Sequence, residues 1–147
     1  MRVHQILKSK AEDGVVTIQP GATVAEAATL LSARRIGSVV VSPDGRSVAG
    51  ILSERDIVRE VARRGTVCLV SPVDDVMTRD VSVCTMEDGA DDILQKMTDG
   101  RFRHLPVMDG DTMVGLISIG DIVSAQVREK EVELKYYKDY IADRYPG

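Results

Sequence analysis

Hydrophobic positions along the chain follow two periods, one typical of helices and one typical of strands. Apolar residues spaced i, i+3, i+4 and i+7 predict amphipathic helices over residues 24–31 and 90–97. Short runs of β-branched and other aliphatic residues, some separated by Pro, Asp and Gly, predict strands and hairpins. These runs cover residues 15–18, 38–41, 48–52, 105–108 and 113–117. Two further helices are expected to start at Ser53 and Ser118.

The same order of elements occurs twice because the chain contains an internal repeat. Residues 15–41 align with residues 81–107 at an offset of 66, and the offset becomes 65 after a turn that is one residue shorter in the second copy. Each copy of about 50 residues is too small to bury a satisfactory core alone. The sequence therefore predicts a mixed α+β fold in which two βαββα repeats, residues 8–65 and 70–127, pack sheet to sheet as a pseudo-twofold pair.

A long helix is predicted over residues 122–142, which are rich in helix formers and contain neither Gly nor Pro. It forms most of a C-terminal helical extension, residues 128–147. One face would carry four apolar side chains, Val127, Leu134, Tyr137 and Ile141. Such a face suits a helix that lies on its own domain or an arm that grips a second subunit. We favour the arm, and with it a homodimer, because both repeats already have helices of their own.

The composition is that of a globular protein, with 44% hydrophobic and 29% charged residues. No apolar run approaches the ~20 residues that a bilayer crossing needs, so a cytoplasmic location without a membrane partner is expected. The net charge of -4 provides no overall positive field for a nucleic-acid backbone, and nucleic-acid binding is not expected. Cys68 and Cys84 lie in apolar stretches without metal-ligand spacing and are expected to be reduced packing residues.

The chain contains few of the residues that catalysis usually requires. The two histidines are His4 and His104, and neither cysteine lies near a histidine in the sequence. A catalytic triad or a zinc centre would need such groups together. We therefore expect a protein that is not an enzyme, with no catalytic residue, no metal and no required cofactor.

A serine-aspartate motif ends both repeats: Gly, two aliphatic residues, Ser, two residues and Asp, at residues 50–56 and 115–121. Ser at a helix N-cap with a carboxylate three residues later is a capping-box pattern. The same groups also suit a nucleotide, because helix N–H groups and a hydroxyl bind phosphate and an Asp accepts hydrogen bonds from ribose. The Gly would let a planar base approach the main chain.

These paired motifs, together with Arg103-His-Leu-Pro-Val107, resemble a tandem cystathionine β-synthase (CBS) domain pair, the Bateman module. The resemblance covers nearly the whole chain. It implies a stand-alone regulatory protein, active in signal or energy sensing, that binds adenine nucleotides in two clefts between the repeats. The implied ligands are AMP, ADP, ATP, NAD or S-adenosylmethionine, and the implied partners are a second subunit and an unidentified regulated protein.

The resemblance also assigns residues to the two clefts by position. In the first cleft, Ser53 and Asp56 would hold phosphate and ribose, and the other contacts would be Leu52, Val81 and Ser82 at the adenine and Arg103 and His104 near the phosphate. In the second cleft, Ser118 and Asp121 would hold phosphate and ribose, and the other contacts would be Ile117, Val15 and Val16 at the base and Arg55 at the phosphate.

The repeats differ at positions that affect charge. Arg103 and His104 of the second copy face Gly37 and Ser38 of the first. Because charge-assisted contacts to phosphate outweigh neutral ones, the two clefts are expected to differ in affinity or preferred ligand. His104 could equally cap its strand. The alternative function is a protein-interaction or oligomerisation module that binds no nucleotide.

Overall fold

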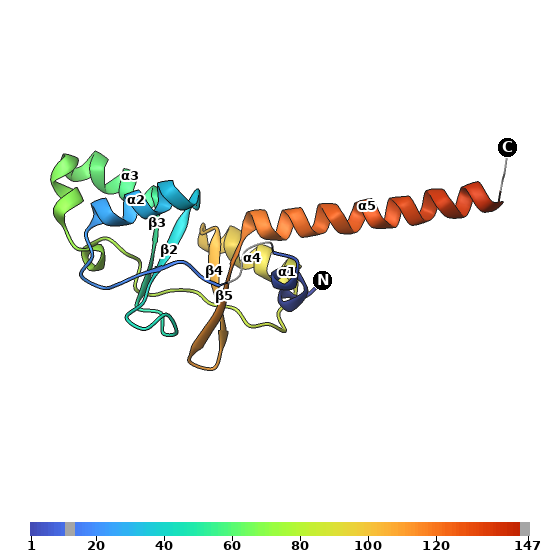
Figure 1. The fold of residues 1–147 in the computed structure, drawn as a ribbon, viewed down its shortest axis with the longest axis horizontal. Helices are drawn as coiled ribbons and strands as arrows, with labels where there is room; N and C mark the ends of the chain where they lie inside the picture. Colours follow the sequence, from blue (N-terminus) through green and yellow to red (C-terminus); the bar gives the residue numbers. More distant parts are fainter. Residues whose placement is uncertain (11–13, 145–147) are drawn as a thin grey trace.

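Two α+β halves lie side by side, and one long helix extends well beyond them (Figure 1). The computed structural model describes residues 1–10 and 14–144. The elements of the first half and of the segment joining the halves are α1 (Val3–Lys8), β1 (Thr17–Ile18), α2 (Val24–Arg34), β2 (Ser38–Val41), β3 (Gly50–Ser53), α3 (Glu54–Arg64), η1 (Gly65–Val70) and η2 (Val73–Asp75). Those of the second half are α4 (Ala90–Gly100), β4 (His104–Asp109), β5 (Thr112–Ser118) and α5 (Ile119–Arg144).

The sheets repeat the same topology with one difference at the edge. In the first half the strand order is β1-β2-β3, with β1 parallel and β3 antiparallel to β2. In the second half β4 and β5 form an antiparallel hairpin, and the counterpart of β1 is a single parallel bridge between Cys84 and Val107. The strand predicted at residues 15–18 is likewise confined to its last two residues. Edge strands are often this short, because a long unpaired edge would invite pairing with other chains.

The two predicted amphipathic helices are α2 and α4, and they bury equivalent positions. The buried residues are Val24, Ala27 and Leu31 in α2 and Ala90, Ile93 and Met97 in α4. Each helix covers the sheet of its own half. The core of the first half includes Ala27, Leu31, Val39, Val41 and Leu52. The core of the second half includes Ile93, Met97, Leu105, Val107 and Ile117.

The chain just before or at the start of each repeat packs on the other half. Helix α1 places Val3 and Ile6 in the core of the second half, whereas the chain after η1 places Val73 and Met77 in the core of the first. The backbone contacts are equivalent as well. Two N–H groups one repeat apart, at the starts of α2 and α4, donate to the carbonyls of Ser71 and Met1, each at 2.9 Å. Each half is thus completed by chain from outside its own repeat.

Equivalent residues meet where the halves touch. Ser38 begins β2 and His104 begins β4, and the Ser38 hydroxyl lies 2.9 Å from Nδ1 of the His104 ring. At the other end of the hairpins, the Met113 N–H donates to the Arg46 carbonyl at 2.7 Å. A contact between two residues at the same position of the repeat marks the pseudo-twofold axis. The predicted fold class, two βαββα repeats packed as a pair, is confirmed.

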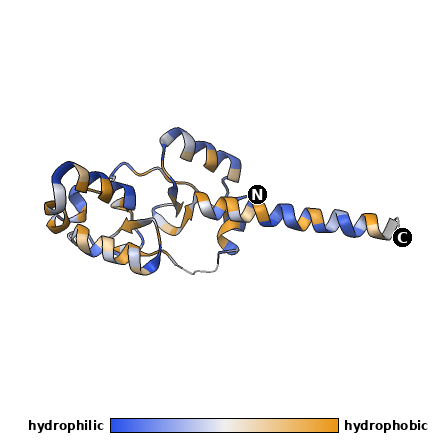
Figure 2. Ribbon diagram, turned by 90° about the horizontal axis from the view of Figure 1, so that it is seen from above, coloured by the Kyte–Doolittle hydropathy of each residue, from blue (hydrophilic) through white to orange (hydrophobic). Residues whose placement is uncertain are grey.

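Helix α5 confirms the predicted C-terminal helix, and its two parts have different environments. The first turns pack against α1, α4 and β5, where Ile122 and Ala125 are buried. Beyond them the helix leaves the body of the molecule, with hydrophobic and hydrophilic residues alternating along it (Figure 2). The distal part does not lie on its own domain. Within residues 1–10 and 14–144, the structure contains no helix with the length and hydropathy that a bilayer crossing requires.

Candidate functional site: two clefts between the repeats

The serine-aspartate motifs form capping boxes at the starts of α3 and α5. The Ser53 hydroxyl accepts a hydrogen bond from the Asp56 N–H at 3.2 Å, and the Asp56 carboxylate accepts one from the Ser53 N–H at 2.8 Å. The corresponding distances for Ser118 and Asp121 are 3.0 and 2.9 Å. The capping interpretation is therefore confirmed, and one carboxylate oxygen of each Asp is occupied within its own helix.

The first N–H groups of these helices are also paired across the half. The Glu54 N–H donates to the Gly37 carbonyl, and the Ile119 N–H donates to the Arg103 carbonyl, both at 2.9 Å. At each helix start, the first and third N–H groups therefore already have partners. A phosphate at either helix would depend more on side-chain donors than on the main chain.

The glycine that opens each motif does not expose the main chain to a base, contrary to the sequence-based expectation. A Cβ at Gly50 would collide with the Met77 side chain and would lie 2.8 Å from the Thr78 carbonyl oxygen. A Cβ at Gly115 would lie 2.8 Å from Cδ1 of Leu7. Both glycines instead allow the segments that cross from the other half to pack closely on the sheets.

The first cleft opens between the start of α3 and the end of α4 and has a volume of about 580 Å³. Four arginines line it: Arg55, Arg59, Arg101 and Arg103. Three acidic residues share the same lining: Glu54, Asp56 and Asp80. The apolar part of the lining comes from Ile51, Val81 and Phe102. The cleft thus combines an apolar wall with charges of both signs.

The second cleft opens between the end of α2 and the start of α5 and has a volume of about 680 Å³. Its described basic residues are Lys10, Arg34, Arg35 and Arg128. Among the lining residues that the structure describes, Asp121 is the one acidic side chain, and Lys10 pairs with it at 2.9 Å. The Lys10 ammonium also donates to the Leu116 carbonyl at 2.9 Å, so two contacts hold it at the lining of the cleft.

The first cleft brings together most of the residues that the sequence assigned to it. These are Ser53, Asp56, Val81, Ser82, Arg103 and His104. Arg55, assigned to the second cleft, lies in the first as well. Leu52 does not reach the cleft, because its side chain is completely buried in the core of the first half.

The second cleft contains fewer of its assigned residues. Ser118 and Asp121 line it, whereas Ile117 is completely buried in the core of the second half. Val15 and Val16 are not part of the described lining, and Val16 packs against the core of the first half. For both strands the assignment is off by one residue: Ile51 and Leu116 line the clefts, while their successors point inward. Successive side chains of a strand face opposite sides of the sheet.

The sequence did not predict several charged residues that line the clefts. These are Lys10, Arg34, Arg35 and Arg128 in the second cleft, and Arg59, Arg101 and Asp80 in the first. The repeat could have indicated two of them. Arg35 and Arg101 occupy the same position of the repeat, two residues before Gly37 and Arg103. Lys10 and Arg128 lie outside the aligned segments, so the repeat could not reveal them.

His104 lines both clefts, since its ring stands at the boundary between the halves. Burial lowers the pKa of His104, although the nearby Asp121 carboxylate acts in the opposite direction. Burial thus disfavours the protonated ring, which makes it a weaker positive partner for a phosphate. Its hydrogen bond with Ser38 shows a role in joining the halves.

Both cysteines are packing residues. Cys68 and Cys84 are buried free thiols, as expected, and burial raises the pKa of Cys84 to about 12. In the part of the chain that the structure describes, no group of three or more His, Cys, Asp or Glu residues is placed to hold a metal ion.

A larger hollow of about 880 Å³ lies between the start of α4 and the exposed part of α5. Its charged lining is mainly acidic: Asp91, Asp92, Glu129 and Glu131, with Lys130. Carboxylates repel a phosphate, and neither serine-aspartate motif reaches this hollow. The clefts between the repeats are therefore better candidates for an anionic ligand despite their smaller volume.

Comparison with known proteins agrees with this duplicated architecture. The family model of the CBS domain matches residues 7–63 and again residues 73–128. The chain belongs to the CBS-domain family. The mitochondrial CBS domain-containing protein CBSX3 of Arabidopsis thaliana is 33% identical over 150 residues, which cover 97% of this chain and 73% of that protein. The resemblance noted in the sequence is thus confirmed.

Solved structures of CBS-domain proteins share the fold. The CBS-domain containing protein ATU1752 from Agrobacterium tumefaciens is 41% identical, with a TM-score of 0.81 over 86% of this chain and 99% of that chain. The CBS domain protein PAE2072 from Pyrobaculum aerophilum, solved in complex with AMP, is 27% identical, with a TM-score of 0.71 over 82% of this chain and 89% of that chain.

Proposed function

We propose that this CBS pair is a non-catalytic regulatory module that binds adenine nucleotides, of the AMP, ATP or NAD type, in the clefts between its repeats. The observation that carries the proposal is the composition of the first cleft. Within about 580 Å³ it combines arginines, carboxylates and an apolar wall. A nucleotide presents the matching groups: an anionic phosphate, a ribose diol and a flat base. The AMP complex of PAE2072 supports the same ligand class.

Each part of the nucleotide has a suitable partner in the first cleft. Arg55 and Arg103 provide planar guanidinium groups that can donate two hydrogen bonds to one phosphate. One oxygen of the Asp56 carboxylate is held by the capping box, and the other lies 3.6 Å from an Arg59 side chain that is largely exposed. That second oxygen is placed to accept a hydrogen bond from a ribose hydroxyl. Val81 contributes to the apolar surface for the base.

Titration of the full chain with AMP, ADP, ATP, NAD and S-adenosylmethionine tests the proposal. A ligand that binds only the native state raises the melting temperature. At a concentration 100 times Kd, it adds about 2.7 kcal/mol to the free energy of unfolding. The double variant Arg55→Gln/Arg103→Gln should weaken binding by tenfold or more, since each charge-assisted contact contributes about 1.5–3 kcal/mol. Isothermal titration calorimetry would measure the change in Kd.

Arg63→Gln is the matched control for this experiment. Arg63 lies at the far end of the same helix and pairs with Glu60, so its loss removes one charge without touching the cleft. Substitution of Asp56 is less suitable, because it also breaks the capping box of α3. A chain that binds none of the five compounds, or a double variant that binds like the wild type, would refute nucleotide binding in this cleft.

A second candidate function, assembly with another copy of the chain, has its own observation. The distal part of α5 exposes Val127, Leu134, Tyr137 and Ile141, with exposed fractions of 50, 54, 62 and 41%. Val127, Leu134 and Ile141 recur every seven residues, with Tyr137 between them, and this spacing is typical of a two-helix seam. We propose that α5 joins two subunits through this face.

Sedimentation velocity of Leu134→Ser/Tyr137→Ser tests the assembly. The wild type should sediment as a dimer and the variant as a monomer, because the substitutions remove the apolar centre of the seam. Val132→Ser is the control, since Val132 is 69% exposed but lies outside the seven-residue spacing. A monomeric wild type, or a dimer that survives the double substitution, would rule out this interface.

A further inference from the structure

Two arginines adopt a backbone conformation that usually belongs to glycine. Arg35 and Arg101 have φ values of 54° and 57°, and they are the non-glycine residues with positive φ in the described chain. They are the C-cap residues of α2 and α4, where a left-handed residue ends the helix. Glycine is the usual residue at such a position, because a side chain there is sterically unfavourable. The repeat has kept the same unfavourable residue type at the same position in both halves.

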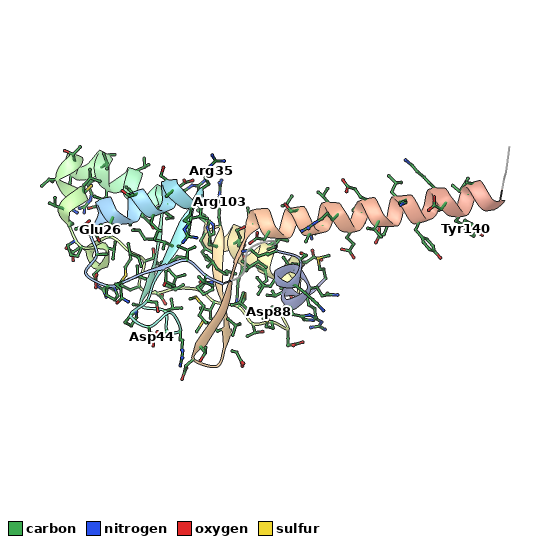
Figure 3. All side chains as sticks on the ribbon, viewed as in Figure 1. Glu26, Arg35, Asp44, Asp88, Arg103 and Tyr140 are labelled. Atoms are coloured by element: carbon green, nitrogen blue, oxygen red, sulfur yellow. The ribbon has the colours of Figure 1, made fainter. Side chains whose placement is uncertain are left out.

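The side chains of these two arginines reach different clefts. Arg35 lines the second cleft and Arg101 lines the first. Figure 3 shows Arg35 and Arg103 on the same edge of the molecule, where the end of α2 approaches the start of β4. Residues in such unfavourable backbone conformations cluster at ligand sites, where the surrounding structure holds them in place. The geometry therefore indicates that each guanidinium serves its cleft.

The charges around Arg35 differ from those around Arg101. Arg35 stands with three further basic residues, Lys10, Arg34 and Arg128, and the acid that faces them in the described lining, Asp121, is already paired with Lys10. The Arg128 side chain is held over the cleft by a 3.4 Å hydrogen bond to the Ser9 hydroxyl. Arg101, in contrast, shares its cleft with three acidic residues. The second cleft thus has an excess of positive charge among its described residues.

The Lys10 contact also changes the charge that a ligand meets in the second cleft. Asp121 occupies the position that Asp56 has in the first cleft, but its Oδ2 atom accepts hydrogen bonds from the Ser118 N–H and the Lys10 ammonium. The ammonium offsets the negative charge of this carboxylate, so a phosphate near it is repelled less than it would be by an unpaired Asp. Arg34, Arg35 and Arg128 donate hydrogen bonds to phosphate oxygens and need no ribose to do so.

We infer that the second cleft is a polyphosphate site, in which Arg35, Arg34 and Arg128 bind a triphosphate group without requiring ribose. The inference deepens the proposed function and rests on its assignment of ligands to the clefts between the repeats. The triphosphate could be free or could belong to a nucleoside triphosphate, since both present the same chain of anionic oxygens. A monophosphate would gain less there, because it can engage fewer of the basic groups at once.

The test is calorimetric titration of the full chain with inorganic tripolyphosphate, ATP and AMP in magnesium-free buffer. Arg35→Gly should weaken tripolyphosphate binding by about tenfold or more, the effect of losing one charge-assisted contact. Arg63→Gln, which removes one positive charge outside both clefts, is the control and should leave it unchanged. Glycine tolerates positive φ, so Arg35→Gly should be at least as stable as the wild type, and a loss of binding would not reflect unfolding.

The two sources of the triphosphate are separated by the wild-type affinities. Equal affinity for tripolyphosphate and ATP indicates a free polyphosphate, whereas tighter binding of ATP that AMP does not displace indicates a nucleoside triphosphate. Arg35→Lys should retain part of the affinity, since it keeps the charge and loses the planar fork.

Absence of tripolyphosphate binding, or equal binding by Arg35→Gly and wild type, would overturn the inference. That failure is distinct from failure of the proposed function. AMP binding that responds to Arg101→Gly would still support a nucleotide in the first cleft, whereas tripolyphosphate binding without any adenine nucleotide binding would refute the proposed function and retain the polyphosphate site.

Discussion

The two clefts share one backbone plan and differ in charge. Each starts with a serine-aspartate capping box, and each is bordered by a helix that ends in a left-handed arginine. The first cleft mixes four basic with three acidic side chains, whereas the described lining of the second has four basic side chains and one acid that is paired with Lys10. Duplication preserved the packing and capping groups, while the charged side chains that line the clefts diverged. Specificity can therefore change here without cost to the fold.

Truncation of the equivalent core residues Leu52 and Ile117 should change stability the most. Both are completely buried, one in each half. Each substitution by Ala should lower the free energy of unfolding by about 2–5 kcal/mol, because it removes buried methyl groups and leaves a cavity. Urea denaturation monitored by circular dichroism measures the loss. We expect comparable losses, since the two halves bury these positions in the same way.

The same variants also test whether these core residues contact a ligand. The AMP affinity of each folded variant should match the wild type, because neither side chain lines a cleft. Val114→Ala is the control, since Val114 is partly exposed on β5 and should change stability little. Selective loss of AMP affinity with little loss of stability would mean that Leu52 or Ile117 contacts the ligand after all.

A smaller effect should distinguish the two motif glycines. Gly50→Ala places a methyl group against the main-chain carbonyl of Thr78 as well as the Met77 side chain, whereas Gly115→Ala meets the end of the Leu7 side chain. A side-chain end can move aside, but the carbonyl is fixed by its hydrogen bond with Ile51. Gly50→Ala should therefore cost about 1–3 kcal/mol, typical of overpacking, and Gly115→Ala should cost less.

Urea denaturation of the two variants provides the measurement. Gly120→Ala is a suitable control, because the nearest atom to its added methyl group is the Ser118 hydroxyl oxygen at 3.7 Å, an ordinary contact. Equal costs at Gly50 and Gly115 would show that the two crossing segments are equally free to adjust, and the proposed difference between the halves would fail.

The smallest effect concerns the pair Ser38 and His104 on the pseudo-twofold axis. Burial lowers the pKa of His104 in the folded chain, while the unfolded chain keeps the ordinary value near 6.5. As the pH falls through about 6.5, the unfolded state therefore binds more protons, and stability is lost until the pH passes the lower folded pKa. His104→Gln should remove this part of the pH dependence.

The measurement is urea denaturation of wild type and His104→Gln across the range from pH 7.5 to pH 5. The difference between the two proteins should change across this range, with the wild type losing more stability at the acidic end. His4→Gln, a substitution on the exposed surface of α1, is the control. Parallel curves for wild type and His104→Gln would show that the ring titrates normally.

Several features of the fold could be predicted because they depend on neighbours in the chain. The i, i+3, i+4, i+7 spacing identified α2 and α4, and the serine-aspartate motifs identified the first turns of α3 and α5. The crossing of α1 and of the segment after η1 was not predicted. A signal exists, since Val3 and Val73 begin similar short segments, but these are too short for the alignment to stand out.

The repeat, the hairpins and the helix starts could be predicted from the sequence alone, because periodicity and capping are local properties. The tertiary structure decided which side of each strand faces a cleft, since the aliphatic runs at Gly50–Ser53 and their counterparts do not alternate with polar residues. It also decided the charge of each cleft. Lys10, Arg35 and Arg128 are far apart in the chain, and the packing of α1, α2 and α5 around the second cleft brings their charges together.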